Sequence, residues 1–278
     1  MKNIGFMQGR LSNVVDGVIQ EFPWQSWEDE FQIASEIDIH IMEWTLDQED
    51  LYLNPLLTNK GQEKISHLCE IYSLKIPSLT GDCFMQSPFW KAEGPEKTSL
   101  VSDFVAIVNA CGKLGIGIIV IPLVDNGSLE NSKQESMLIN TLNEYDAMLK
   151  KLNVKIAFES DFAPQKLAEF INLLDSESFG INYDIGNSAA LGFIPDEEFS
   201  HYGDRIINVH VKDRPLGRTT VPLGEGDSDF ESVFKNLSKH NYKGNYILQT
   251  ARDRAHRHSH VLKRYSAQTT NWIQKYGS

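Results

Sequence analysis

Residues that could bind a metal ion stand at the ends of four consecutive apolar segments of this 278-residue chain. Glu159 follows VKIAF and Asp184 follows FGINY. His210 lies within INVHV, and Gln249 ends the segment NYILQ. A charge at the end of a buried segment needs a partner or a metal ion. Because two carboxylates, an imidazole and an amide oxygen suit Mn²⁺, Mg²⁺, Co²⁺ or Zn²⁺, we expect these four residues to bind one divalent metal ion.

Further polar side chains end the other apolar segments, or follow closely after an end. They are Gln8, Arg10, Glu43, Asp82, Asp125, Asn187, Lys212 and Arg252. Taken singly, each is an ordinary solvated loop residue. If the segments are parallel strands of one sheet, however, these side chains meet at the carboxyl ends of the strands, where active sites of such folds assemble.

The apolar segments have the length and spacing of strands in alternating strand–helix units. Eight strands are expected at Ile4–Gln8, Ile39–Trp44, Lys75–Leu79, Gly117–Leu123, Val154–Glu159, Gly180–Asp184, Ile206–Val211 and Asn245–Gln249. Eight helical patterns accompany them, at Trp24–Glu36, Lys60–Ser73, Thr98–Leu114, Glu130–Lys151, Pro164–Leu174, Pro195–Tyr202, Asp229–His240 and Arg254–Lys275. Uninterrupted apolar strands indicate a sheet covered on both faces. We therefore expect an α/β fold, a (β/α)8 TIM barrel forming a single domain over residues 1–278. An open doubly wound sheet is the alternative, but no G-x-G-x-x-G follows the first strand.

The charge and cysteine content limit the partners. The chain carries 26 Lys and Arg against 38 Asp and Glu, a formal charge of −12. Such an acidic chain is not expected to bind nucleic acid. Three widely spaced cysteines outside any CxxC motif indicate reduced thiols. No signal peptide or membrane span is recognised, so we expect a cytoplasmic protein without a membrane partner.

Four segments carry a family resemblance: FES (158–160), YDIGN (183–187), VHVKD (209–213) and PLGEGDSDF (222–230). They resemble the xylose isomerase-like TIM barrels of sugar and sugar-phosphate isomerases and epimerases, among them ketose 3-epimerases. The opening MQGRL (7–11) also resembles members of this group. The resemblance implies a small carbohydrate substrate, neutral, phosphorylated or acidic, and a homodimer is plausible for the family.

The resemblance also implies roles for individual residues. It makes Glu159 both a metal ligand and the general base, and Asp184 and His210 further ligands. It brings Lys212 and Arg218 near the substrate oxygens and Glu225 near the metal. The expected catalytic residues are then Glu159, His210 and Lys212. The expected substrate-binding residues are Gln8, Arg10, Glu43, Asn187, Arg218 and Arg252.

Position 249 departs from the family pattern. The 3-epimerases carry a glutamate there that is both a ligand and a second base, whereas this chain carries Gln249. An amide oxygen can still bind a metal, but an amide cannot accept a proton near pH 7. The sequence therefore favours chemistry with one base, either 1,2-isomerisation or a lyase step, unless Lys212, Glu43 or a metal-bound water is the second base.

Two clusters have a structural and a functional interpretation. The segment ARDRAHRHSH (251–260) either begins a solvated helix or binds a phosphate through Arg252, helped by Arg10 or Lys212. Aromatic residues such as Trp44 and those of Phe84–Trp90 belong to the core or line a sugar pocket.

The expected function is a divalent-metal-dependent sugar or sugar-phosphate isomerase or epimerase that works through an enediolate, with Glu159 as base. Three alternatives stay open. One is a keto-polyol dehydratase on the same barrel, and another is a non-catalytic sugar-binding barrel. The third is an apurinic endonuclease, a relative that needs three zinc ions.

Overall fold

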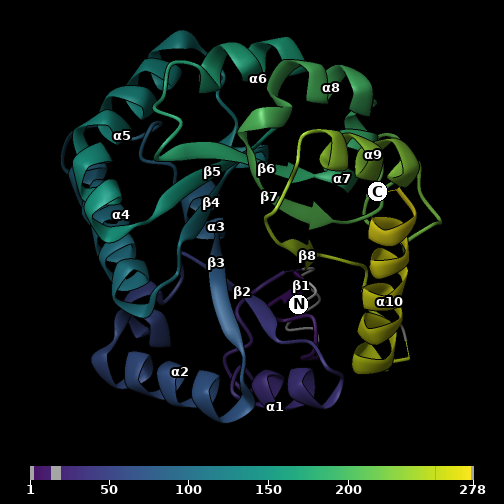
Figure 1. The fold of residues 1–278 in the computed structure, drawn as a ribbon. Helices are drawn as coiled ribbons and strands as arrows, with labels where there is room; N and C mark the ends of the chain where they lie inside the picture. The colour runs from purple at the N-terminus through teal and green to yellow at the C-terminus, as the bar shows by residue number, and fades with distance from the viewer. Residues whose placement is uncertain (1–2, 14–19, 254, 277–278) are drawn as a thin grey trace.

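Parallel strands close into a barrel in the computed structural model, which describes residues 3–13, 20–253 and 255–276 (Figure 1). Each strand pairs with the next in sequence, and β8 pairs with β1. The strands are β1 (Ile4–Met7), β2 (Ile41–Leu46), β3 (Lys75–Gly81), β4 (Ile118–Leu123), β5 (Lys155–Ser160), β6 (Phe179–Asp184), β7 (Ile206–Val211) and β8 (Tyr246–Leu248). The expected (β/α)8 barrel is confirmed, and the open-sheet alternative is wrong.

Helices surround the barrel and connect its strands (Figure 1). The α-helices are α1 (Asp29–Glu36), α2 (Asn59–Tyr72), α3 (Asp82–Gln86), α4 (Gly94–Leu114), α5 (Ser132–Leu152), α6 (Pro164–Ile171), α7 (Ile185–Leu191), α8 (Pro195–Tyr202), α9 (Phe230–Lys239) and α10 (His258–Tyr276). Four short 3₁₀ turns accompany them, η1 (Leu51–Leu53), η2 (Pro55–Leu57), η3 (Asp125–Gly127) and η4 (Gly203–Arg205). The eight expected helices correspond to α1, α2, α4, α5, α6, α8, α9 and α10. Helices α3 and α7 were not expected from the sequence. They follow β3 and β6 directly and are too short to show a clear helical period of apolar residues.

Two helices, α1 and α10, begin four or more residues later than expected because local hydrogen bonds form turns first. Residues 24–28 make turns in which Ser26 N donates to Pro23 O, so α1 begins at Asp29 rather than at Trp24. Before α10, the carboxylate of Asp253 accepts a hydrogen bond from Arg257 N. The helix begins at His258, while Arg254, its expected first residue, lies outside the described residues.

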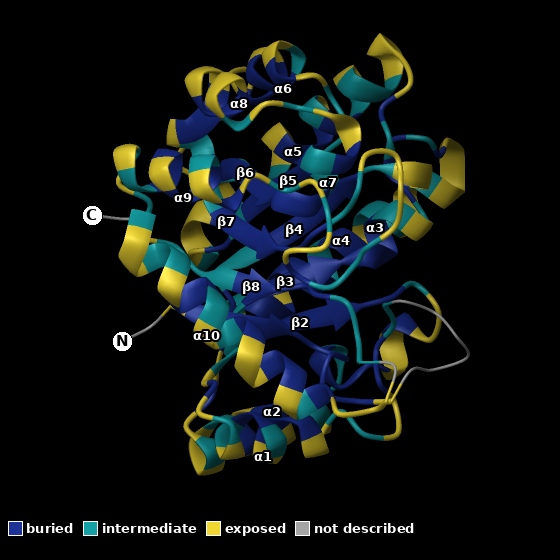
Figure 2. Ribbon diagram, turned by 90° about the vertical axis from the view of Figure 1, so that its right-hand side faces the viewer, coloured by how far each residue is buried: buried dark blue, intermediate teal, exposed yellow. Residues whose placement is uncertain are grey.

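The strands are buried on both faces, as their uninterrupted apolar sequences predicted (Figure 2). Phe158 of β5 is fully buried and packs edge-on against Phe170 of α6, with ring centroids 5.2 Å apart. It also stacks on Phe179 of β6 at 6.4 Å. These contacts fix the strand whose next residue is Glu159. None of the described helices is long and apolar enough to cross a membrane.

We expect Phe158→Ala to destabilise the barrel by about 3–5 kcal/mol, because it removes a fully buried ring from close-packed neighbours. Urea unfolding followed by circular dichroism measures the change. Phe162→Ala is the matched control, since that ring is only partly buried at the edge of the same cluster. A loss below 1 kcal/mol for Phe158→Ala would contradict this account of β5.

Candidate active site at the carboxyl ends of the strands

A cavity of about 650 Å³ opens where the carboxyl ends of the strands meet. Its wall includes residues from the segments after β1, β3, β4, β5, β6, β7 and β8. Among the lining residues are Gln20, Asp82, Asp125, Glu159, Asp161, Asn187, Lys212, Arg214 and Gln249. Of the residues expected at the site, Glu159, Asn187, Lys212 and Gln249 are part of this wall. The aromatic residues considered as a sugar-binding wall are not, because Trp44, Phe84, Phe89 and Trp90 belong to the core.

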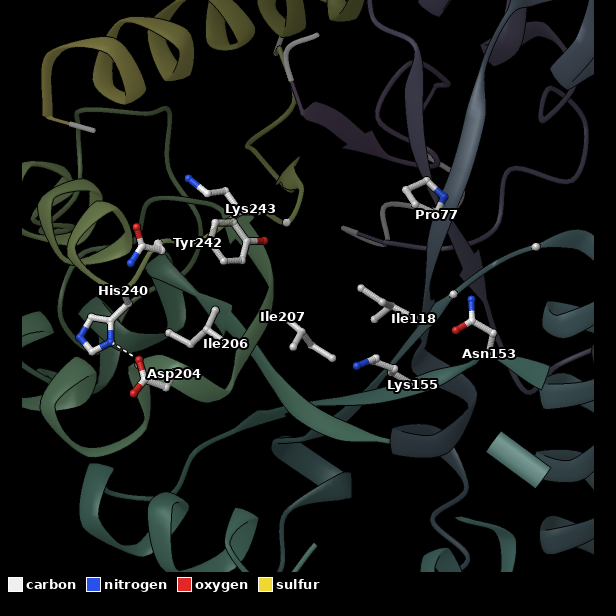
Figure 3. Close-up of a pocket in the computed structure, with 15 residues that line it drawn as sticks. Pro77, Ile118, Asn153, Lys155, Asp204, Ile206, Ile207, His240, Tyr242 and Lys243 are labelled. Carbon is white, nitrogen blue, oxygen red and sulfur yellow. Dashed lines mark hydrogen bonds and ion pairs between the residues drawn. The ribbon is translucent and has the colours of Figure 1, made fainter. Parts of the chain in front are cut away.

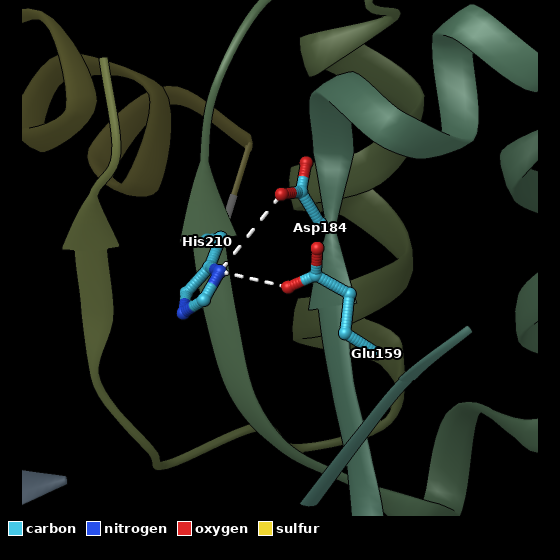
Figure 4. A group of neighbouring side chains, drawn as sticks. All are labelled: Glu159, Asp184 and His210. Atoms are coloured by element: carbon cyan, nitrogen blue, oxygen red, sulfur yellow. Dashed lines mark ion pairs between the residues drawn. The ribbon is translucent and has the colours of Figure 1, made fainter. Parts of the chain in front are cut away.

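Glu159, Asp184 and His210 converge on one another, and Glu159 is the member of the group that lines the cavity (Figure 4). Each offers one ligand atom, and the three atoms lie within 4.8 Å of one another. His210 Nδ1 is 3.1 Å from Glu159 Oε2 and 3.8 Å from Asp184 Oδ2. Strand register explains the convergence, because Asp184 stands directly opposite His210 in the β6–β7 pair.

The other ring nitrogen of His210, Nε2, contacts the carboxylate of Glu43 on β2. His210 Nε2 lies 2.7 Å from Glu43 Oε1, and both side chains are fully buried. Since Nε2 makes this contact, Nδ1 is the nitrogen turned toward Glu159 and Asp184. A carboxylate behind a histidine in this way is the usual support of a metal-binding imidazole.

The structure places Glu43 away from the cavity, so the expected contact with substrate does not fit. Its carboxylate accepts hydrogen bonds from Ser78, Thr80 and Asn208 as well as from His210. Burial raises the pKa of Glu43, but the charge of His210 and these hydrogen bonds outweigh burial and hold the pKa below its ordinary value. Glu43 is therefore an ionised, fully bonded support, and it is no candidate for a second base.

Two asparagines orient the carboxylate of Glu159. Asn182 Nδ2 donates to Glu159 Oε2 at 2.8 Å, and Asn187 Nδ2 donates to Oε1 at 2.6 Å. Both amides come from β6 and the start of α7, the segment that also carries Asp184. A carboxylate has about four acceptor positions, so each oxygen of Glu159 keeps one for another partner.

Lys212 stands between Asp184 and Gln249. Its Nζ lies 2.7 Å from Asp184 Oδ2 and donates to Gln249 Oε1 at 3.0 Å. Gln249 follows the short strand β8, and its Nε2 donates to Gln20 Oε1 at 2.8 Å. The amide oxygen that was expected to bind the metal is thus occupied by Lys212 in this structure.

Gln8, Arg10 and Arg252 lie behind the cavity wall instead of in it. Gln8 is fully buried, and its Oε1 accepts a hydrogen bond from Thr45 N. Burial and the nearby charge of Arg252 lower the pKa of Arg10 to about 9. Arg252 Nη1 donates to the backbone oxygen of Ser12 at 2.6 Å. The expected substrate contacts of these three residues are replaced by contacts that hold the segment after β1.

The loop between β7 and α9 also differs from expectation. Arg218 and Glu225 are exposed and outside the cavity lining, whereas Arg214 lines the cavity and was missed. The buried carboxylate of Asp213 accepts hydrogen bonds from the backbone N–H groups of Gly224 and Gly226. A Cβ at Gly226 would lie 2.2 Å from Asp213 Oδ1, so only glycine fits there. The GEG motif therefore closes the loop on Asp213 rather than approaching the metal ligands.

A separate cavity of about 570 Å³ lies at the amino ends of the strands (Figure 3). It is lined by residues that begin β4 and β7 and by the segment before β8, and at one side His240 Nδ1 contacts Asp204 at 2.7 Å. None of the residues expected at the site from sequence lines this cavity. The chemistry-bearing side chains gather at the opposite end of the barrel.

The chain belongs to the xylose isomerase-like TIM barrel family, whose model matches residues 31–276. It is 24% identical over 234 residues to L-ribulose-5-phosphate 3-epimerase UlaE of Escherichia coli, covering 81% of this chain and 82% of that protein. D-psicose 3-epimerase of Clostridium cellulolyticum H10, solved with D-tagatose, superposes with a TM-score of 0.74 at 9% identity, over 100% of both chains. The IolI protein, solved with a bound zinc atom, gives 0.75 at 15% identity over 99% of both. The family expected from sequence is confirmed.

The donor atoms present fit a divalent cation. Asp184 is buried, and its Oδ2 lies 2.7 Å from Lys212 Nζ and 3.8 Å from His210 Nδ1. Donors on one ion at about 2.0–2.3 Å lie roughly 3–4.5 Å apart, which matches the spacing of Glu159, Asp184 and His210. Among the described residues these three form the one group of acidic and histidine side chains with such spacing.

We expect Glu43→Gln to weaken binding of Mn²⁺ or Zn²⁺ by about 10- to 100-fold, because the imidazole of His210 loses its carboxylate support. Isothermal titration of the metal-free protein measures the affinity. Glu198→Gln is the matched control, a buried glutamate whose carboxylate accepts hydrogen bonds from Tyr183, Ser188 and Tyr202 and does not contact His210. Equal affinities for the parent and Glu43→Gln would argue against metal binding through His210.

Proposed function

We propose that this chain is a divalent-metal-dependent isomerase or epimerase of a sugar or sugar phosphate and that it works through an enediolate. The observation that carries the proposal is the convergence of Glu159, Asp184 and His210, of which Glu159 lines the cavity. The epimerases named among the relatives support the substrate class.

Glu159 is the base in this proposal. It lines the cavity, and the amides of Asn182 and Asn187 fix the orientation of its carboxylate. The carboxylate removes the proton from the carbon beside the carbonyl group, and the electron pair moves toward the carbonyl oxygen. A divalent cation held by Glu159, Asp184 and His210 would supply Lewis-acid polarisation of that carbonyl group.

Lys212 is suited to bind the oxygen on which negative charge develops. Its ammonium group lies on the cavity wall beside Asp184, and Gln249 Oε1 holds it in place. A fixed positive charge at a largely buried position stabilises a developing oxyanion more than a solvated one does. Lys212 thus has the position of an electrostatic catalyst, and Gln249 positions it.

The other functions considered from sequence have weaker support. An apurinic endonuclease binds three zinc ions, and the described residues contain one group with metal-ligand spacing. A keto-polyol dehydratase would share the same first proton transfer. A barrel that only binds sugar would not need an oriented carboxylate in the cavity.

The test is conversion of L-ribulose 5-phosphate, D-tagatose and D-psicose in the presence of Mn²⁺, with the products separated by chromatography. We expect the parent to convert at least one of them to an isomer or epimer. Glu159→Gln should lower the rate by about 100- to 10,000-fold, since the base is lost. Glu225→Gln, which changes an exposed glutamate outside the cavity, is the control. Elimination of water as the main reaction would instead support the dehydratase.

If the substrate carries a phosphate, Arg214 is the side chain that we expect to bind it, in place of Arg252. Arg214 lines the cavity, and its guanidinium is fixed by Asn187 Oδ1 and by the backbone oxygen of Arg218. Arg214→Met should then raise KM for L-ribulose 5-phosphate about tenfold or more and change KM for D-tagatose little. Arg218→Met, an exposed arginine on the same loop, is the matched control. Equal increases for both sugars would mean that Arg214 only shapes the loop.

A further inference from the structure

Asp82 is a buried carboxyl group in the cavity that the reaction proposed above does not use. It is the first residue of α3, directly after β3, and its side chain lines the same cavity as Glu159. Asp82 is 7% exposed, so little solvent competes for its carboxyl group. It reaches the cavity from β3, whereas Glu159 reaches it from β5. Strand β4 lies between β3 and β5, so the two carboxyl groups reach the cavity from strands that are not neighbours in the barrel.

Asp82 is held by a chain of amides that ends at Lys212. Gln20 Nε2 donates to Asp82 Oδ2 at 2.6 Å, and Gln20 Oε1 accepts a hydrogen bond from Gln249 Nε2 at 2.8 Å. Gln249 Oε1 in turn accepts from Lys212 at 3.0 Å. In both side-chain amides, those of Gln20 and Gln249, the nitrogen donates a hydrogen bond and the oxygen accepts one. Gln249 therefore connects Lys212 to Gln20, and Gln20 connects it to Asp82.

The groups that face Asp82 leave it able to gain and lose a proton near neutrality. Burial raises its pKa most, and the carboxylate of Asp47 after β2 raises it further. The Gln20 hydrogen bond lowers it, Glu159 on β5 raises it, and Arg10 after β1 lowers it. The pKa is raised to about 7. The neighbouring thiol of Cys83 is neutral, because burial holds its pKa well above the usual value.

We propose that Asp82 is a catalytic residue, the second acid–base group of the enediolate reaction, and that it replaces the carboxylate missing at position 249. The proposal rests on the function proposed above. Glu159 takes the proton from one face of the carbon beside the carbonyl group, and the electron pair forms the enediolate. Protonated Asp82 then delivers its proton to the other face of that carbon as the carbonyl group re-forms. Asp82 ends ionised and Glu159 protonated, and exchange with water resets both. Epimerisation thereby becomes possible although Gln249 cannot accept a proton.

The experiment is Asp82→Asn, assayed in D₂O with L-ribulose 5-phosphate, D-tagatose and D-psicose as probes. We expect the yield of epimer to fall at least 100-fold, while the recovered substrate still gains deuterium, because Glu159 still exchanges the proton on its own face. Glu159→Gln should lose both exchange and epimerisation. Asp103→Asn removes a buried carboxylate that lies outside the cavity lining and accepts hydrogen bonds from Gln48 and Tyr52, and it should stay within threefold of the parent. Epimer yield from Asp82→Asn within threefold of the parent would overturn the proposal.

The pH profile separates a catalytic role from a structural one. In the parent, kcat/KM should show an ionisation near pH 7 that Asp82→Asn removes and Asp82→Glu restores. Gln20→Met keeps Asp82 and removes the hydrogen bond that favours its ionised form, so this ionisation should move to higher pH. An unchanged profile in Gln20→Met would also overturn the proposal. A parent that converts none of the probes refutes the proposed function itself, whereas an active parent with an unaffected Asp82→Asn variant refutes only the role of Asp82.

Discussion

The imidazole of His210 lies in the closed interior of the barrel, and the arrangement of the site depends on how its two nitrogen atoms are partnered. A buried imidazole beside carboxylates is costly unless every polar atom finds a partner. Glu43 takes one nitrogen, and Ser78, Thr80 and Asn208 then complete the shell of Glu43. The result is a polar layer beneath the cavity, in a barrel interior otherwise filled by apolar side chains. This layer determines which ring nitrogen of His210 is turned toward Glu159 and Asp184.

The same constraint extends to the carboxylates above the ring. Asn182 contacts both Glu159 and His210, so the positions of base and imidazole are coupled through one amide. Asp184 is coupled to Lys212, and Lys212 to Gln249. A substitution at any of these positions therefore also affects groups that the substituted residue does not contact. The effects of substitutions within this network on activity should not be additive.

The barrel and the convergence of Glu159, Asp184 and His210 were predictable because they depend on patterns that a sequence carries directly. Apolar strands at a regular spacing predict the barrel, and a polar residue at the end of such a strand points to its mouth. Glu43 follows the same pattern as Glu159, yet it faces the layer below because the position along the strand decides the depth. Arg214 and Arg218 lie on one loop. Only the way in which that loop closes on Asp213 decides that Arg214 lines the cavity and Arg218 does not. Asp82 was seen as a strand-end residue, but its partner Gln20 is far away in sequence and gave no signal.

The hydrogen bonds between Asp213 and the glycine-rich segment also separate parts of the protein whose sequences can change at different rates. The bonded pair Asp213–Gly226 fixes both ends of a loop whose middle, residues 216–219, is exposed. Residues in that middle can be exchanged, lengthened or given other charges without disturbing β7 or the ligands on it. The loop is therefore a natural place for substrate preference to diverge within one reaction type, and the first segment to randomise when a new sugar is wanted.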